Sequence, residues 1–143
     1  MTALNFRNIR IGQKKFFKIV ISTNDIDKFS KISGDTNTIH LEKEAAVKKN
    51  FKNRVVHGAY ILSLFSKLIG TKLPGNNALV LFMDVKFNNP AYPNKIINIV
   101  GKVKEKHKSV NSIVLELCAK YPDGTAIEKF PCPSPSELPP LSL

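Results

Sequence analysis

Apolar positions along the chain follow two different periods, and the change comes at the Pro-Gly break of residues 73–77. Before the break, residues 57–71 are apolar on almost every side, which predicts a helix buried on most faces rather than a surface helix with one apolar stripe. After it, apolar and polar residues alternate at residues 79–87, 97–103 and 113–119. Such alternation predicts strands with one face on the core.

Signals upstream of the apolar helix predict a strand and two short helices. Residues 16–22 are β-branched and aromatic, which favours a strand. Ser22 and Asp25 have the spacing of a capping box, so a helix is expected to begin there and to end at Gly34. We expect its apolar residues to share one face: Ile26, Phe29 and Ile32. Another short helix is expected over residues 41–50.

The C-terminal part of the chain predicts a hairpin followed by an irregular tail. Asp123 and Gly124 form a hairpin turn signal that leads into a last strand over residues 125–130. Residues 131–143 carry closely spaced prolines, which exclude regular structure. We therefore predict one domain over residues 1–130 and an irregular Pro-rich tail. A helix that is apolar on most sides needs a sheet around it, so the fold class is α+β, with a curled antiparallel sheet.

The net charge is +11, from 22 Lys and Arg against 11 Asp and Glu. This favours anionic partners, although a lysine-rich composition can also reflect genome bias alone. Nucleic acid is not the expected partner, because no zinc finger, RNP motif or basic heptad segment is present. Two basic groups could bind the phosphates of a ligand or simply be solvated. One alternates along a predicted strand, and the other precedes the apolar helix: Lys102, Lys104, Lys106 and Lys108, and Lys48, Lys49, Lys52 and Arg54.

Cysteine usage and the N-terminus favour a cytoplasmic, soluble protein. Cys118 and Cys132 belong to no CxxC or Cys/His cluster, so neither a metal site nor a disulfide is expected. The first residues lack the apolar core of a signal peptide. The longest apolar run, residues 59–69, is too short for a membrane span and contains Lys67. We expect no membrane partner.

Three residues in a fixed order indicate chemistry on a carbonyl compound. Asp35 and His40 lie in a polar loop, and a carboxylate and an imidazole form a workable acid–base pair near neutral pH. Gly58 opens the apolar helix, where backbone N–H groups can stabilise an oxyanion. Each residue also has a structural explanation, as a turn residue, a buried histidine and a packing glycine. Their joint occurrence favours an enzyme.

Two motifs resemble those of the MaoC-like, (R)-specific enoyl-CoA hydratases. Residues 29–40 (FSKISGDTNTIH) are similar to the signature loop of that family. Residues 55–66 (VVHGAYILSLFS), with the Leu-Pro-Gly that follows at 73–75, resemble its central helix. Residues 87–90 (FNNP) are similar to the start of its next strands, so that the resemblance covers roughly residues 10–128.

The resemblance implies a hotdog fold, in which the sheet wraps one long helix and short helices form an overhanging segment. It also implies a homodimer with no cofactor. The family adds water to a trans-2-enoyl-CoA to give the (R)-3-hydroxyacyl-CoA, and the reverse dehydration is equally allowed. The expected partner is thus an acyl-CoA or acyl-carrier thioester.

Carried over residue by residue, the resemblance places the catalytic roles on Asp35, His40 and Gly58. Asp35 and His40 would hold one water and exchange protons with it and with the substrate, while the Gly58 N–H would bind the thioester oxygen. His57, Ser63 and Asn37 are expected near the substrate: His57 lines the pocket or bonds within its loop, Ser63 lies by the pocket or only eases helix packing, and Asn37 mainly holds the turn.

Other readings stay open, and the sequence departs from the family pattern in places. Thr38 stands where the family usually has Pro, Asn94-Lys95 replaces a frequent Gly-Asp, and the chain turns Pro-rich after Phe130 instead of continuing the last strand. A hotdog acyl-CoA thioesterase is the first alternative. The second is a basic module that binds an acyl thioester or nucleic acid without catalysis.

Overall fold

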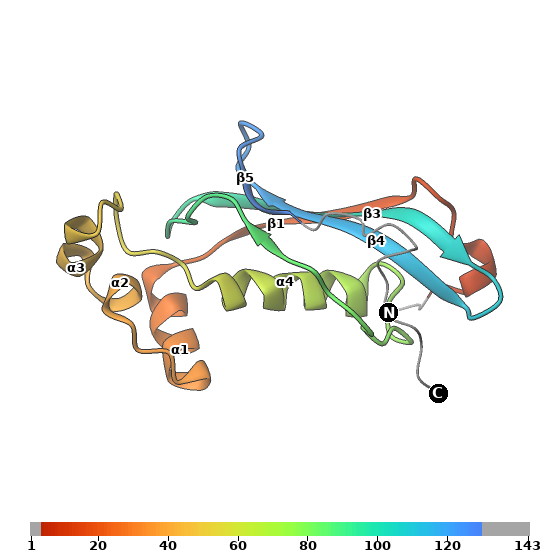
Figure 1. Cartoon of the computed structure of the whole chain (residues 1–143), viewed down its shortest axis with the longest axis horizontal. Coiled ribbons are helices and arrows are strands. Elements are labelled where there is room, and N and C mark those ends of the chain that lie inside the picture. Colours follow the sequence, from red (N-terminus) through yellow and green to blue (C-terminus); the bar gives the residue numbers. More distant parts are fainter. Residues whose placement is uncertain (1–3, 130–143) are drawn as a thin grey trace.

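The computed structural model describes residues 4–129 and shows one antiparallel sheet curved over a long helix (Figure 1). The five strands have the order β1-β3-β4-β5-β2. They are β1 (Lys14–Val20), β2 (Lys86–Phe87), β3 (Ile96–His107), β4 (Ser112–Lys120) and β5 (Ala126–Lys129). The long helix is α4 (Gly58–Thr71), and a short 3-10 helix η1 (Phe6–Asn8) precedes β1. This is the α+β hotdog architecture expected from the sequence.

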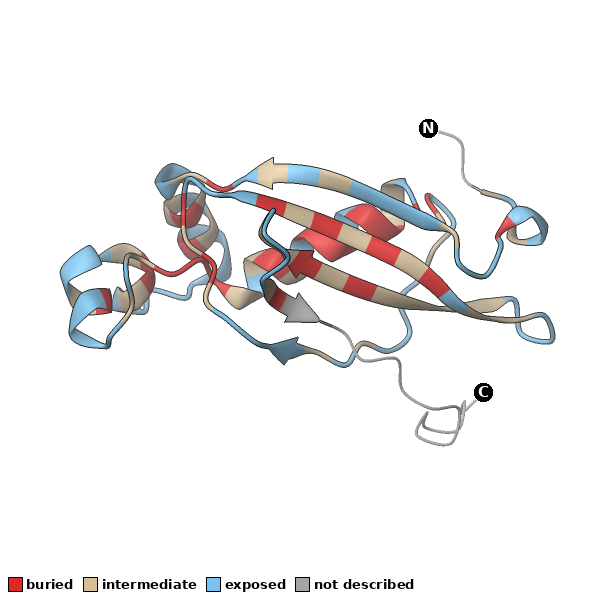
Figure 2. Ribbon diagram, turned by 90° about the horizontal axis from the view of Figure 1, so that it is seen from above, coloured by how far each residue is buried: buried red, intermediate tan, exposed pale blue. Residues whose placement is uncertain are grey.

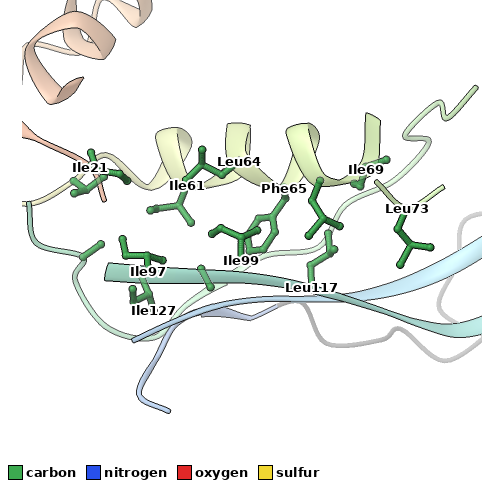
Figure 3. Close-up of a cluster of buried hydrophobic side chains, with 14 of the residues drawn as sticks. Ile21, Ile61, Leu64, Phe65, Ile69, Leu73, Ile97, Ile99, Leu117 and Ile127 are labelled. Atoms are coloured by element: carbon green, nitrogen blue, oxygen red, sulfur yellow. The ribbon is translucent and has the colours of Figure 1, made fainter. Parts of the chain in front are cut away.

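The core lies between α4 and the concave face of the sheet (Figure 3). The buried residues of α4 are Ile61, Leu64, Phe65, Leu68 and Ile69. Alternate residues of the central strands meet them: Ile97, Ile99, Val103, Leu117 and Ala119. Burying each large aliphatic side chain contributes about 1.5–3 kcal/mol. Gly101 lets the helix approach, since a Cβ there would lie 2.7 Å from Leu68 Cδ2.

Helices α1 (Thr23–Ser33), α2 (Thr38–Leu41) and α3 (Lys43–Lys48) form an overhang at one end of the sheet (Figure 1). The capping box that begins α1 is confirmed, because Ser22 Oγ accepts from Asp25 N at 3.1 Å and Asp25 Oδ2 accepts from Ser22 N at 2.9 Å. The Ser22 hydroxyl also donates to Asp25 Oδ2 at 2.7 Å, and this bond, together with the one from Ser22 N, holds the pKa of the Asp25 carboxyl below its usual value. Gly34 ends the helix with φ of 77°, also as predicted.

Three details of the predicted pattern are wrong. Ile32 is 84% exposed, and the buried polar residue of α1 is Ser30. Within the described residues, the predicted strand over residues 79–87 is reduced to the two residues of β2, which pair with β5. The helix predicted over residues 41–50 is the shorter α3, and Leu41 belongs to the separate helix α2.

The predicted row of four lysines on one strand face is also wrong. A bulge between Val103 and Glu105 breaks the alternation of β3. Lys104 then lies 3.8 Å from Glu116, while Lys106 Nζ donates to Ile9 O at 2.8 Å and lies over the Phe6 ring. These lysines therefore make separate local contacts and do not form one phosphate-binding row.

Across residues 4–129, the structure contains no helix that is long and apolar enough to cross a membrane. The predicted irregular tail, residues 131–143, lies outside the described residues. The single domain predicted for residues 1–130 stays a prediction.

Candidate active site

The segment between α1 and α2 places Asp35 against the start of α4. The Asp35 carbonyl accepts two hydrogen bonds, from Ser30 Oγ at 2.6 Å and from His57 Nε2 at 3.1 Å. Asn37 then caps α2, since its Oδ1 accepts from Ile39 N at 3.3 Å. The Asn37 N–H donates to Asp35 Oδ1 at 3.1 Å, which orients the carboxylate. Asn37 thus has the turn-holding role expected for it.

His40 is 8% exposed and its ring is fixed from one side. Its Nδ1 lies 2.7 Å from Val55 O, a carbonyl that can only accept, so Nδ1 carries the proton. In the neutral imidazole, Nε2 then carries no proton and can accept a hydrogen bond. This Nε2 lies 3.7 Å from Asp35 Oδ2.

Two unprotonated acceptors at this separation can share one proton donor that lies beside them. A water molecule can donate one O–H to the carboxylate and the other to Nε2. The Asp35–His40 pair can therefore hold a water molecule, and the catalytic role expected for it from the sequence stays a prediction. The Asp35 side chain is 51% exposed, so water and substrate can reach it.

His57 is a buried ring that contacts both Asp35 and His40. It is 1% exposed, and its ring stacks on that of His40 with centroids 3.8 Å apart. Phe29 covers it from α1, with ring centroids at 5.1 Å. Burial lowers the pKa of His57, which favours the neutral ring. Its Nε2–H holds the Asp35 carbonyl, so the structure gives His57 the bond within the loop rather than a place in the cavity lining.

The buried state of His57 predicts an acid-sensitive fold. Because its pKa is lower in the folded chain, the unfolded chain takes up the proton first as the pH falls through the ordinary value of 6.5. The folded state therefore loses stability from that pH downward, until the folded-state pKa is passed. We expect a smaller acid loss in His57→Gln, whose amide can still donate to Asp35 O. Urea unfolding over a pH series compares the two proteins; parallel curves would exclude this role.

A cavity of about 310 Å³ opens beside His40. Its walls come from the 51–58 segment, α4, the segment after β2, and β5: Phe51, Val55, Val56, Gly58, Ile61, Phe87, Asn88, Asn89, Pro90, Ala91 and Ile127. Gly58 is the first residue of α4, where N–H groups lack intrahelical acceptors, so its N–H is available to a ligand oxygen. A Cβ on Gly58 would overlap the Phe87 ring.

Ser63 is not part of this cavity wall. It is exposed on α4, and its hydroxyl donates to the Tyr60 carbonyl at 2.6 Å. Within the described chain, Asp35, His40, His57 and Gly58 come together, and Ser63 stays apart from them.

The sequence pattern missed several residues of the site. Ser30, which holds Asp35, had one usable signal, since it stands one helical turn after the buried Ile26. Arg54, assigned above to a basic group, is only 14% exposed and is bonded to Asp27 and to the His40 carbonyl. Phe87 gave no local sign of its contact with Gly58.

The cluster also has the spacing of a metal site. One ligand atom each of Asp35, His40 and His57 lies within 4.8 Å of the others. However, His57 Nε2 donates to Asp35 O, and turning that nitrogen into a ligand would move the proton to the buried Nδ1, which has no partner. The absence of a metal, expected from the sequence, stays a prediction.

The sequence of the chain is similar to those of known proteins. The MaoC-like domain matches residues 8–119 of the chain. The chain is 32% identical over 105 residues to a 3-hydroxybutyryl-CoA dehydratase of Methylorubrum extorquens, covering 73% of this chain and 67% of that protein. It is also 32% identical over 105 residues to an (R)-specific enoyl-CoA hydratase of Rhodospirillum rubrum, covering 71% of this chain and 73% of that one.

A solved structure extends the similarity to the whole fold. The unliganded R-hydratase PhaJ1 of Pseudomonas aeruginosa superposes with a TM-score of 0.83 at 26% identity, covering 99% of this chain and 97% of that one. Because the domain match covers residues 8–119 and both relatives are 32% identical to the chain, the chain belongs to the MaoC-like domain family.

Proposed function

We propose that the chain catalyses the (R)-specific hydration of trans-2-enoyl thioesters and the reverse dehydration of (R)-3-hydroxyacyl thioesters. The observation that carries the proposal is the pair of facing acceptors, Asp35 Oδ2 and His40 Nε2, at 3.7 Å. His40 lines the same cavity as Gly58 at the start of α4. The cavity thus has a proposed base, His40, and a proposed oxyanion donor, the Gly58 N–H, on its walls.

In the proposed reaction the thioester oxygen accepts the Gly58 N–H, and water held between Asp35 and His40 attacks Cβ of the enoyl group. The water oxygen bonds to Cβ as one water proton passes to the pair, and the C=C electrons move toward the thioester oxygen. The pair then returns one proton to Cα, so H and OH are added and the enzyme is unchanged. Charge on the oxygen is stabilised by the helix N-terminus.

Exposed lysines beside the cavity support an anionic carrier on the thioester. Lys48 ends α3, and Lys49 and Lys52 follow in the segment that leads to Phe51 and Val55 of the cavity wall. All three are exposed, unlike Arg54. CoA or an acyl carrier protein would both present phosphate to them. The choice of carrier, the absence of a cofactor and a cytoplasmic location stay predictions.

The direct test is the loss of enoyl-thioester absorbance when purified protein meets crotonyl-CoA, with chiral analysis of the product. Formation of the (R)-3-hydroxy product supports the proposal. Release of free CoA thiol with the double bond intact would instead indicate a thioesterase. Absence of both, with longer enoyl chains as well, would refute the enzymatic proposal.

The edge of the sheet at β2 supports the proposed homodimer. The exposed fractions of Leu79, Leu81 and Phe82 are 81%, 69% and 51%. Figure 2 shows β2 among the exposed segments of the sheet edge. A second copy laid along this edge would cover these side chains and could pair with residues 79–85, which form no strand within the described part of the chain.

Replacing Leu81 with lysine is therefore expected to shift the protein from dimer to monomer. The reason is that a buried, unpaired ammonium at the interface is costly. Sedimentation velocity over a concentration series measures the shift, and Lys95→Met, a change at an exposed site outside this edge, is the control. A wild-type protein that stays monomeric at all concentrations contradicts the proposal.

A further inference from the structure

The contacts of Arg54 are those of a residue that supports the structure, not of a residue that binds a ligand. Its side chain is 14% exposed, although the segment around it carries exposed lysines. Its Nη2 donates to Asp27 on α1, and its Nε donates to the backbone carbonyl of His40. A guanidinium with both sides engaged in this way is not available to an incoming phosphate.

Three hydrogen bonds join residues 39–40 to residues 54–55, and the bond from Arg54 Nε to His40 O is one of them. Val55 N donates to Ile39 O at 3.0 Å, and His40 Nδ1 donates to Val55 O at 2.7 Å. With the Arg54 bond to His40 O, both the backbone and the ring of His40 are attached to residues 54–55. Arg54 also donates to Asp27, so its side chain connects these two segments to α1.

Helix α1 then holds both members of the catalytic pair. Ser30 on α1 donates to the Asp35 carbonyl at 2.6 Å. Asp27 stands three residues earlier on the same helix, so both side chains lie on neighbouring turns of one rigid element. Asp35 is fixed through Ser30, and His40 is fixed through Arg54 and Asp27.

We propose that Arg54 is a positioning residue that ties His40, through Asp27, to the helix that holds Asp35, and so sets the separation of the two reacting groups. The proposal rests on the function proposed above for Asp35 and His40. Without Arg54, the hydrogen bonds between residues 39–40 and residues 54–55 would be those of Val55 alone, and His40 Nε2 could move away from the water that the pair shares. Misplacement by about 1 Å at a reacting centre can cost about 10²-fold in rate.

The test compares Arg54→Met, Arg54→Lys and Asp27→Asn with the control Lys43→Met. Lys43 is an exposed cation on α3, so its loss changes net charge without touching His40. We expect Arg54→Met to lower kcat for crotonyl-CoA by about 10²-fold per folded molecule with little change in KM, because binding contacts are intact. Arg54→Lys should rescue part of the rate, since one ammonium can reach Asp27 or the carbonyl.

Imidazole nitrogen NMR gives a readout that a merely structural role would not change. The chain has three histidines, so His57→Gln and His107→Gln spectra assign the His40 signals. Wild-type His40 should show one tautomer with the proton on Nδ1, and Arg54→Met should show a mixture. Asp27→Asn, at a half-exposed side chain, should show a smaller change in the same direction and covers the case in which Arg54→Met does not fold.

Unchanged His40 signals in Arg54→Met and Asp27→Asn, with kcat within about 3-fold of wild type per folded molecule, would overturn the proposal. The two hypotheses fail differently. A wild type that turns over no enoyl thioester refutes the proposed function, whereas the His40 tautomer signals test the positioning by Arg54 without any substrate.

Discussion

Replacing Asp35 with asparagine is expected to remove nearly all turnover, by about 10³-fold or more, in the range of lost general acid–base catalysis. The amide keeps an oxygen for the Asn37 N–H, which Asp35 Oδ1 accepts at 3.1 Å. It also presents an N–H toward His40 Nε2, which removes the need for a bridging water. The carboxylate is 51% exposed, so stability should change by only about 0.5 kcal/mol.

The matched change at the other member of the pair is His40→Asn. The asparagine amide nitrogen can stand where Nδ1 stands and donate to Val55 O, which His40 Nδ1 reaches at 2.7 Å, while the Nε2 base is lost. His40→Ala would leave that buried carbonyl unpaired, at about 1–3 kcal/mol, and so confound rate with stability.

Steady-state hydration assays on both single variants and on the double variant measure the roles. Since the two groups act on one water, the double variant should be little slower than either single one. Rates near wild type in either single variant, with the thermal midpoint unchanged, would show that the roles are assigned wrongly.

The elements with strong local periodicity were predictable from sequence. The helix expected over residues 57–71 is α4 within one residue, and the apolar alternation of 97–103 and 113–119 falls inside β3 and β4. Each pattern reports the burial of its own element, so no knowledge of neighbours is needed. The capping box and Gly34 set the ends of α1 for the same local reason.

The segment at residues 79–87 shows where such reasoning stops. Its alternation is real, yet Leu79 and Leu81 are 81% and 69% exposed in the single chain. A strand needs a hydrogen-bonding neighbour, and among residues 4–129 the structure pairs only Lys86 and Phe87 of this segment with β5. Periodicity therefore identified a surface suited to burial but not which neighbour would bury it.

In the site, residues within one short motif were predictable and long-range contacts were not. Asp35 and His40 are close in sequence, so their order alone indicated the pair. Arg54 bonds to Asp27 on α1. The two residues are far apart in the sequence, and neither composition nor a short motif identifies such a partner. An arginine among lysines looks like another solvated cation until its exposure is known.

Replacing Gly58 with alanine is the second change expected to have a large effect, with kcat/KM reduced by about 10²-fold. Alanine keeps the backbone N–H, so the proposed oxyanion donor is not removed. The new Cβ would instead overlap the Phe87 ring, which lines the same cavity as His40. Either Phe87 moves or the start of α4 moves, and both change where the thioester oxygen meets the N–H.

The double variant Gly58→Ala/Phe87→Ala separates these causes. Phe87 is 59% exposed on the two-residue strand β2, so truncating its ring should cost little stability and should give the Cβ room. We expect the double variant to recover most of the rate that Gly58→Ala loses, measured against Phe87→Ala alone in the crotonyl-CoA assay. If the double variant is as slow as Gly58→Ala, the Cβ itself obstructs the thioester oxygen. In that case Gly58 is required for substrate approach rather than for packing against Phe87.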